Sequence, residues 1–255
     1  MAPLRMTRQH RGLRSYIWTW QHSAQLLVLL LAFWLVLWHA APLLMHQWAD
    51  ALAWAWPHLG LGSSDGVQVK TTSLLGVPIE VVRTQFYVPP PNLWQWWGGA
   101  LMCIGLMVLS FVLSRERLPL IYGLRIVALL GMVGLLSYEF LPALAVSDVN
   151  RLLADNILDM GLAMLWLLPA VHALVLYIFP IPVLHKVAAT LTGLLMLVVS
   201  IPLQAASLAW LAQQCSLLVA VPLYMLFSFL PQIAAQLGIY GLFMSFAPAP
   251  EHGGA

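Results

Sequence analysis

The chain has 255 residues, of which 62% are hydrophobic and only 8% are Asp, Glu, Lys or Arg, and its formal net charge is +2. A water-soluble domain of this composition would aggregate, whereas a bilayer protein tolerates it because lipid replaces water around its surface. The few basic residues are dispersed, which excludes the basic face expected of a nucleic-acid-binding domain. The sequence therefore predicts an all-α polytopic membrane protein.

The N-terminal region combines a basic tail, 1–23, with a long apolar run. Arg5, Arg8, Arg11 and Arg14 followed by apolar residues resemble the first two regions of a secretory signal peptide. The run extends towards Met45, however, and no A-x-A cleavage pattern follows it. We therefore expect residues 24–45 to form an uncleaved first transmembrane helix.

The first part of the next segment, 46–97, is rich in tryptophan and carries little charge. Tryptophan prefers the headgroup zone of a bilayer, so we expect an interfacial helix here, lying along the outer membrane surface. The polyproline step at 89–91 then leads to a second aromatic group at the entrance of the next span. The predicted interface anchors of both groups are Trp48, Trp54, Trp56, Trp94, Trp96 and Trp97.

The second part of this extracytoplasmic loop has the pattern of a β-hairpin. Residues 67–72 alternate in polarity, 77–88 are rich in Val, Ile, Phe and Tyr, and Gly76 lies between the two runs. A two-stranded hairpin is only marginally stable in water, so we expect it to pack on another surface. The residues predicted to contact a partner are Val77, Ile79, Val81, Phe86 and Tyr87.

Residues 98–243 contain enough apolar sequence for five further spans, which makes a six-helix transmembrane bundle, and 244–255 form a C-terminal tail. The glycine spacings Gly131-x-x-Gly134 and Gly238-x-x-Gly241 indicate faces on which helices pack closely. The five predicted spans cover about 98–113, 120–141, 158–179, 183–206 and 216–243.

The distribution of Lys and Arg predicts the orientation in the membrane. The basic residues of the tail, Arg115, Arg117 and Lys186 lie on one side of the predicted spans, so the positive-inside rule places both termini in the cytoplasm. The hairpin would then lie outside. Small size, compact spans and a basic start favour a bacterial inner membrane.

Several ionisable residues are expected near the outer ends of the spans, where each is a functional candidate because charge is costly at membrane depth. Together they would make a metal site, a proton relay or a substrate clamp. A structural role is the alternative, since Asp155 and Asp159 begin a helix and Arg151 can pair with Asp155 one turn away. The predicted outer-face cluster is His39, His46, Glu139, Arg151, Asp155 and Asp159.

Three functions follow from these observations. The first is a non-catalytic integral subunit or accessory protein of a larger envelope complex, contacting other membrane proteins through its helices and outer loop. The second is a self-contained transporter or membrane enzyme that uses the outer-face cluster. The third is a haem- or quinone-binding electron-transfer subunit, because His22 and His172 are expected at matching depth. We predict no cofactor, and no local catalytic motif is present in the sequence.

Overall fold

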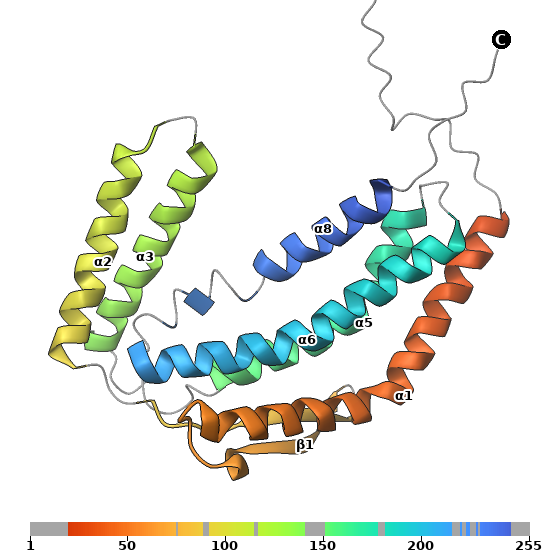
Figure 1. Ribbon diagram of the computed structural model, residues 1–255, viewed down its shortest axis with the longest axis horizontal. Coiled ribbons are helices and arrows are strands. Elements are labelled where there is room, and N and C mark those ends of the chain that lie inside the picture. Colours follow the sequence, from red (N-terminus) through yellow and green to blue (C-terminus); the bar gives the residue numbers. More distant parts are fainter. Residues whose placement is uncertain are drawn as a thin grey trace, which may run out of the picture.

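The computed structural model describes residues 20–74, 76–88, 92–114, 117–140, 151–177, 182–215, 220, 223–224, 228 and 230–245. The chain is mostly helical (Figure 1). Its elements in order are α1 (Trp20–His58), the 3₁₀ turn η1 (Ser64–Gly66), β1 (Val67–Leu74), β2 (Val77–Thr84), α2 (Leu93–Val112), α3 (Leu118–Phe140), the π-helical turn η3 (Arg151–Asp155), α5 (Asn156–Tyr177), α6 (Val183–Cys215) and α8 (Leu230–Ser245).

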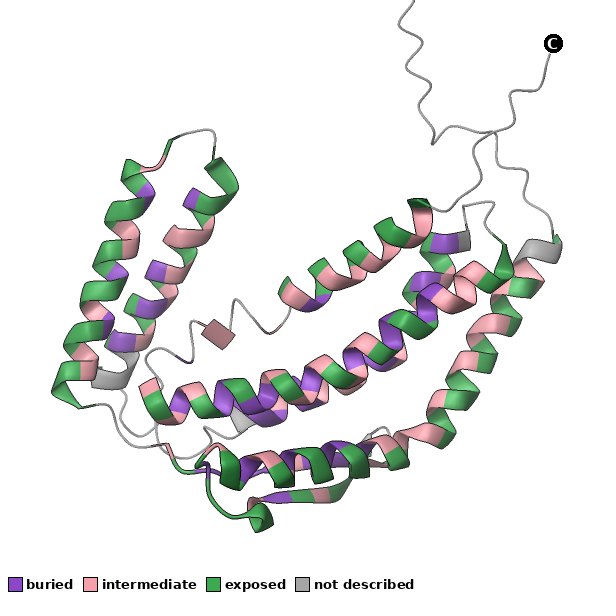
Figure 2. Ribbon diagram, in the orientation of Figure 1, coloured by how far each residue is buried: buried purple, intermediate pink, exposed green. Residues whose placement is uncertain are grey.

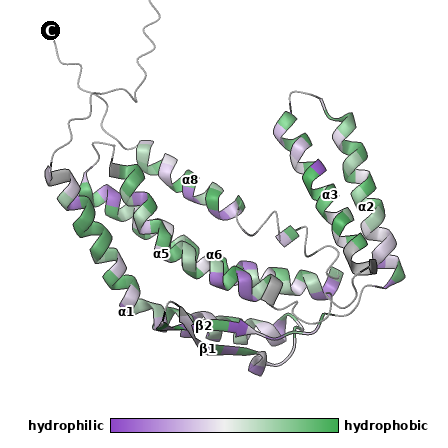
Figure 3. Cartoon of the chain, turned by 180° about the vertical axis from the view of Figure 1, so that it is seen from behind, coloured by the Kyte–Doolittle hydropathy of each residue, from purple (hydrophilic) through white to green (hydrophobic). Residues whose placement is uncertain are grey.

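Five helices are long and apolar enough to cross a bilayer, which confirms a multi-pass membrane protein. They lie within α1, α2, α3, α6 and the segment Leu153–Leu176. Hydrophobic residues make up most of the length of these helices (Figure 3). The predicted sixth span, 216–243, overlaps α8, which has only 16 residues, and most of the sequence just before α8 lies outside the described residues.

Helix α1 differs from the prediction because the first span and the interfacial segment form one continuous helix of 39 residues. Pro42 lies inside α1, and the helix bends without ending (Figure 1). Beyond the bend, Met45, Trp48, Leu52 and Trp56 recur at helical spacing and are all buried. This apolar stripe packs inside the protein, and the segment continues the helix of the first span instead of forming a separate helix.

The predicted hairpin between the first two spans is confirmed. Strands β1 and β2 are antiparallel and pair from Val67 with Thr84 to Leu74 with Val77. The connection has two residues, and Gly76 has a φ of +83°, a value that favours glycine. The hairpin packs on the second half of α1, where Val67 and Val82 join the core around Trp56. Its own chain therefore supplies the packing surface that a two-stranded sheet needs.

Helices α1, α5, α6 and α8 form the main bundle, whose buried residues concentrate on α5, α6 and the second half of α1 (Figure 2). Two glycines allow close packing. A Cβ on Gly161 of α5 would lie 2.5 Å from Ile201 of α6, and one on Gly193 would lie 2.6 Å from Gln236 of α8. The glycines singled out from the sequence behave differently, since Gly134, Gly238 and Gly241 have no such neighbour within 4 Å.

Helices α2 and α3 pack on each other and stand apart from the main bundle (Figure 1). Their shared core contains Cys103 and Leu135, with Trp96 packed beside them. The predicted single six-helix bundle is therefore replaced, among the described residues, by two helical groups joined through the hairpin region. The start of α1, the end of α5 and the start of α6 lie together at the end of the molecule opposite the hairpin (Figure 1).

Candidate functional site

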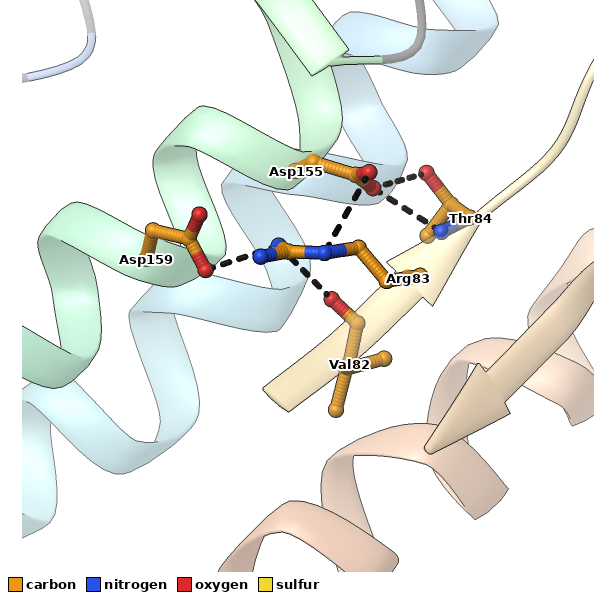
Figure 4. A network of polar contacts seen from close by, with 5 residues as sticks. All are labelled: Val82, Arg83, Thr84, Asp155 and Asp159. Carbon is orange, nitrogen blue, oxygen red and sulfur yellow. Dashed lines mark hydrogen bonds and ion pairs between the residues drawn. The ribbon is translucent and has the colours of Figure 1, made fainter. Parts of the chain in front are cut away.

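Arg83 of strand β2 is the centre of a polar cluster between the hairpin and the start of α5. Its Nη1 donates a hydrogen bond to Asp159 Oδ1 at 2.8 Å, and its Nε lies 4.0 Å from Asp155 Oδ2 (Figure 4). One guanidinium thus reaches two carboxylates that lie one helical turn apart. We call Arg83, Thr84, Asp155 and Asp159 the hairpin latch.

Asp155 is the buried member of the hairpin latch, with 5% of its surface exposed. Its Oδ1 accepts two hydrogen bonds from Thr84, one from the backbone N–H at 2.8 Å and one from the hydroxyl at 2.9 Å. The π-helical turn η3 ends at Asp155 and precedes the regular helix α5. A buried carboxylate requires such partners, because an uncompensated charge away from water is strongly destabilising.

The sequence predicted the carboxylates of this cluster but not their partner. Asp155 and Asp159 do share a helix face, as their spacing indicates, and both interact with Arg83. The predicted pairing of Asp155 with Arg151 concerns a side chain outside the described residues. The signal in the sequence was Arg83 itself, a charged residue that directly follows Val81 and Val82 in the predicted strand. Such a residue needs a carboxylate nearby if the strand is buried.

Of the remaining members of the predicted cluster, the structure describes the side chains of His39 and His46. His46 Nε2 of α1 lies 3.5 Å from Glu80 Oε2 of β2, which is a second polar contact between the hairpin and the bundle. His39 is exposed on α1. Glu139 belongs to α3, but its side chain lies outside the described residues. Among the described side chains, His46, Asp155 and Asp159 therefore contact the hairpin.

Two of the predicted interface anchors, Trp48 and Trp56, are buried inside the protein. Trp48 Nε1 donates to the carbonyl oxygen of Val198 in α6 at 2.8 Å. Pro202, four residues later in α6, has no N–H to give that carbonyl, so the indole replaces the missing helix bond. Trp56, which is fully buried, donates in the same way to the carbonyl of Gln85 at 3.1 Å.

The other predicted anchors include exposed rings. Trp54, Trp94 and Trp97 remain accessible, whereas Trp96 packs against the shared core of α2 and α3. An indole held inside a protein can satisfy a backbone carbonyl, while an exposed one is free to reach the membrane interface.

The residues predicted to contact a partner divide in a similar way. Val81 and Phe86 are buried in the chain itself, with 4% and 9% of their surfaces exposed. Val77 and Tyr87 are exposed, and Ile79 is half-buried. The hairpin therefore uses part of the predicted surface to pack on its own helices and leaves the turn and the segment after β2 accessible.

The predicted electron-transfer residues lie at the opposite end of the molecule. His172 is buried in α5, and its Nδ1 lies 3.2 Å from the hydroxyl oxygen of Thr190 in α6. The side chain of His22 lies outside the described residues. Within the part of the chain that the structure describes, no three His, Cys, Asp or Glu residues are grouped as metal ligands would be.

The fold and the hairpin latch define a multi-pass membrane protein that carries a β-hairpin fixed to its helical bundle. Comparisons of the chain with protein-family models, with curated proteins and with solved structures found no match.

Proposed function

We propose that this chain is a non-catalytic integral subunit of a larger envelope complex in a bacterial inner membrane, with both termini in the cytoplasm and the hairpin outside. One observation carries the proposal. The carboxylates that would form an outer-face active or transport site are instead bound by Arg83 and Thr84, and their bonds hold the hairpin on the bundle. Because the carboxylates of Asp155 and Asp159 hold the hairpin on the bundle, they support a structural role for the cluster.

The fixed hairpin offers a surface suited to another protein. Strand β2 is held from the bundle side, because the backbone N–H of Thr84 is bonded to Asp155. Strand β1 is the outer strand, and Lys70, Thr71, Thr72 and Ser73 are exposed along it. An edge strand presents backbone donors and acceptors to which a partner can add a strand of its own. A strand already held in place binds at a smaller entropic cost than a mobile one.

Co-purification of the full-length chain tests the proposal. The tagged protein is extracted in mild detergent, and the proteins recovered in stoichiometric amount are identified by mass spectrometry. A photo-crosslinking residue replaces Thr72 in β1, and the matched control carries it at Leu191, which is exposed on α6. In cells, we expect crosslinking from position 72 to give an adduct with a partner protein. Crosslinking from position 191 should give an adduct only with lipid or with a different protein.

A monodisperse protein without partners, together with no protein adduct at Thr72, would contradict the subunit proposal. The alternative of a self-contained transporter or membrane enzyme would then become the working hypothesis. It predicts that Asp159→Asn abolishes activity while the hairpin stays docked, which hydrogen exchange of β1 and β2 measures directly.

A further inference from the structure

The free edge of strand β1 can be assigned residue by residue, because backbone bonds alternate along the hairpin. In an antiparallel pair, residues that exchange hydrogen bonds alternate with residues whose N–H and C=O groups point away from the partner strand. Gln85 N–H donates to the carbonyl oxygen of Gly66, so these two residues form a bonded pair. The next pair, Val67 with Thr84, must then point outward. The N–H of Thr84 does so, since it bonds to Asp155.

The same alternation continues to the turn of the hairpin. Lys70 and Thr72 belong to pairs that bond to β2. Val69, Thr71 and Ser73 belong to the pairs in between, so their N–H and C=O groups point to the free edge. Ser73 is opposite Pro78, which has no N–H to give, as this assignment requires. In the part of the chain that the structure describes, no strand pairs with this edge.

The outer edge of β2 is occupied by other groups. The carbonyl oxygen of Val82 accepts a hydrogen bond from Arg83 Nη1 at 3.5 Å, and the N–H of Thr84 donates to Asp155 at 2.8 Å. Strand β2 also contacts η3 and α5, whereas β1 lies on the side of the hairpin away from these elements (Figure 3). Of the two edges, that of β1 is therefore the one that a further strand can reach.

The two faces of β1 carry different side chains. Val67 and Val69 pack towards the core around α1, whereas Gln68, Lys70 and Thr72 alternate with them and are all exposed. No carboxylate forms an ion pair with Lys70 among the described residues. Because Lys70 bonds to β2, it would form the non-bonded kind of pair with an added antiparallel strand, and side chains lie closer in such pairs. An acidic residue of the added strand would meet Lys70 there.

A second copy of this chain fits the edge less well. The groups at the free edge are centred on Thr71, so two copies of β1 would pair antiparallel about this residue. The Lys70 side chains of the two copies would then lie diagonally on the same face, about 7–8 Å apart. Like charges repel at this distance, and a lysine in an edge strand is a common protection against self-pairing. The charge thus disfavours a copy and favours an acidic segment.

We propose that the free edge of β1 binds an extended segment of a partner subunit, which places a carboxylate side chain opposite Lys70. The backbone groups of Val69, Thr71 and Ser73 bond to the backbone of that segment. These bonds provide the affinity, and the charge pair selects an acidic segment over a neutral one. The assignment rests on the subunit function proposed above and specifies the kind of segment that the partner contributes.

Hydrogen exchange of single amides in the full-length chain tests the backbone bonds. In the purified chain, the amides of Thr71 and Ser73 should exchange quickly, whereas those of Lys70 and Thr72 should be protected by their bonds to β2. In the complex with a stoichiometric partner, exchange at Thr71 and Ser73 should slow by about tenfold, because each N–H gains a backbone acceptor. Unchanged exchange at both residues while the partner stays bound would overturn the edge assignment and leave the subunit function intact.

A pair of variants at one residue tests the same bonds through recovery of the partner. Thr71→Pro removes an N–H that bonds to nothing in the hairpin, and proline is tolerated in edge strands at such positions. Thr71→Ala keeps the N–H and is the matched control. The proline variant should reduce recovery of the partner by about tenfold, whereas the alanine variant should not. Protection of the Lys70 and Thr72 amides shows whether the hairpin remains folded, and equal recovery in two folded variants would contradict the proposal.

The charge pair is tested by variants of Lys70 that leave the backbone unchanged. Lys70→Glu should weaken binding of the partner by about tenfold, because an attraction is replaced by a repulsion, whereas Lys70→Arg should preserve it. Replacing the acidic residue of the bound segment with lysine should restore binding to Lys70→Glu. Equal binding by Lys70→Glu and Lys70→Arg would overturn the assignment of an acidic segment.

Two further outcomes identify other causes. If the purified chain alone protects the Thr71 amide increasingly as its concentration rises, a second copy occupies the edge and the assignment to a partner subunit is wrong. If no protein is recovered with the wild-type chain in stoichiometric amount, the subunit function fails, and the assignment of the edge fails with it.

Discussion

The hairpin region and the α2–α3 pair are attached to the protein in opposite ways. The hairpin lies outside the apolar spans, yet it is held by ion pairs, by hydrogen bonds to buried Asp155 and by the packing of Val82 against α1. The α2–α3 pair consists of two candidate spans, yet it packs mainly on itself (Figure 2). The hairpin is held in place by polar contacts that are partly shielded from water. The α2–α3 pair lacks such contacts with the bundle among the described residues, and in lipid no hydrophobic force drives apolar helices together.

The largest effect is expected from removing the buried carboxylate of the hairpin latch. Asp155→Ala leaves the backbone N–H and the hydroxyl of Thr84 without their acceptor, while Arg83 keeps Asp159. A hydrogen bond to a charged group contributes about 1.5–3 kcal/mol, so the loss of two should cost about 3–5 kcal/mol. Hydrogen exchange should show loss of protection across β1 and β2, with a lowered unfolding temperature in detergent. Asp50→Ala, at an exposed position of α1, is the control. Unchanged protection of the hairpin in Asp155→Ala would contradict the latch.

The tie between α1 and α6 should have the next largest effect. Trp48→Phe keeps most of the ring but removes the N–H that satisfies the Val198 carbonyl, at a cost of about 1–3 kcal/mol for a buried unsatisfied group. Adding Pro202→Ala restores a backbone N–H to α6, so the double variant should recover part of the loss. Chemical unfolding of the single and double variants measures this coupling, and strictly additive effects would show that the indole does not replace the helix bond.

The main bundle and the α2–α3 pair also differ in how closely their helices pack around glycine. Gly161→Ala places a methyl group within 2.5–2.8 Å of Ile201 and should destabilise the main bundle by about 1–3 kcal/mol. Gly134→Ala in α3 meets no neighbour within 4 Å, so helix propensity should make it neutral or stabilising by up to about 1 kcal/mol. Thermal unfolding compares the two variants, and Gly161→Ala combined with Ile201→Ala should relieve the clash. Equal effects would mean that α2–α3 is as tightly packed as the bundle.

The smallest effect is expected within the α2–α3 pair. Arg125 Nε donates to Ser110 Oγ at 3.2 Å, and its guanidinium lies 4.7 Å from the centre of the Phe111 ring. Arg125→Gln loses both contacts at a partly exposed position, so a cost of about 1 kcal/mol is expected. Distance measurements between spin labels on α2 and α3 should show a broader distribution. No change would indicate that Arg125 serves the membrane surface rather than the helix pair.

Features that depend on neighbouring residues could be predicted from the sequence, whereas features that join distant segments could not. The hairpin could be predicted because the alternation of polar and apolar residues and the presence of Gly76 are local signals. The spans could be predicted because each is a long run of apolar residues. The latch joins Arg83 to a carboxylate 76 residues away, a pairing that sequence spacing does not encode. The burial of Trp48 and Trp56 could have been predicted, because with Leu52 they recur every four residues and form one apolar face of a helix. The prediction relied on the number of tryptophans in the segment and did not use this spacing.

The distance along the chain between the two halves of the latch also sets an order of events during synthesis. Thr84 is made 71 residues before Asp155, and both α2 and α3 are produced in between. Protein synthesis proceeds at about 5–20 residues per second, so Asp155 is made about 4–14 s after Thr84. During that interval α1 can already cover one side of β2, but the side that contacts η3 and α5 is uncovered. The maturing protein is therefore most open to proteases, chaperones and unintended strand pairing at this stage, and the arrival of α5 ends it.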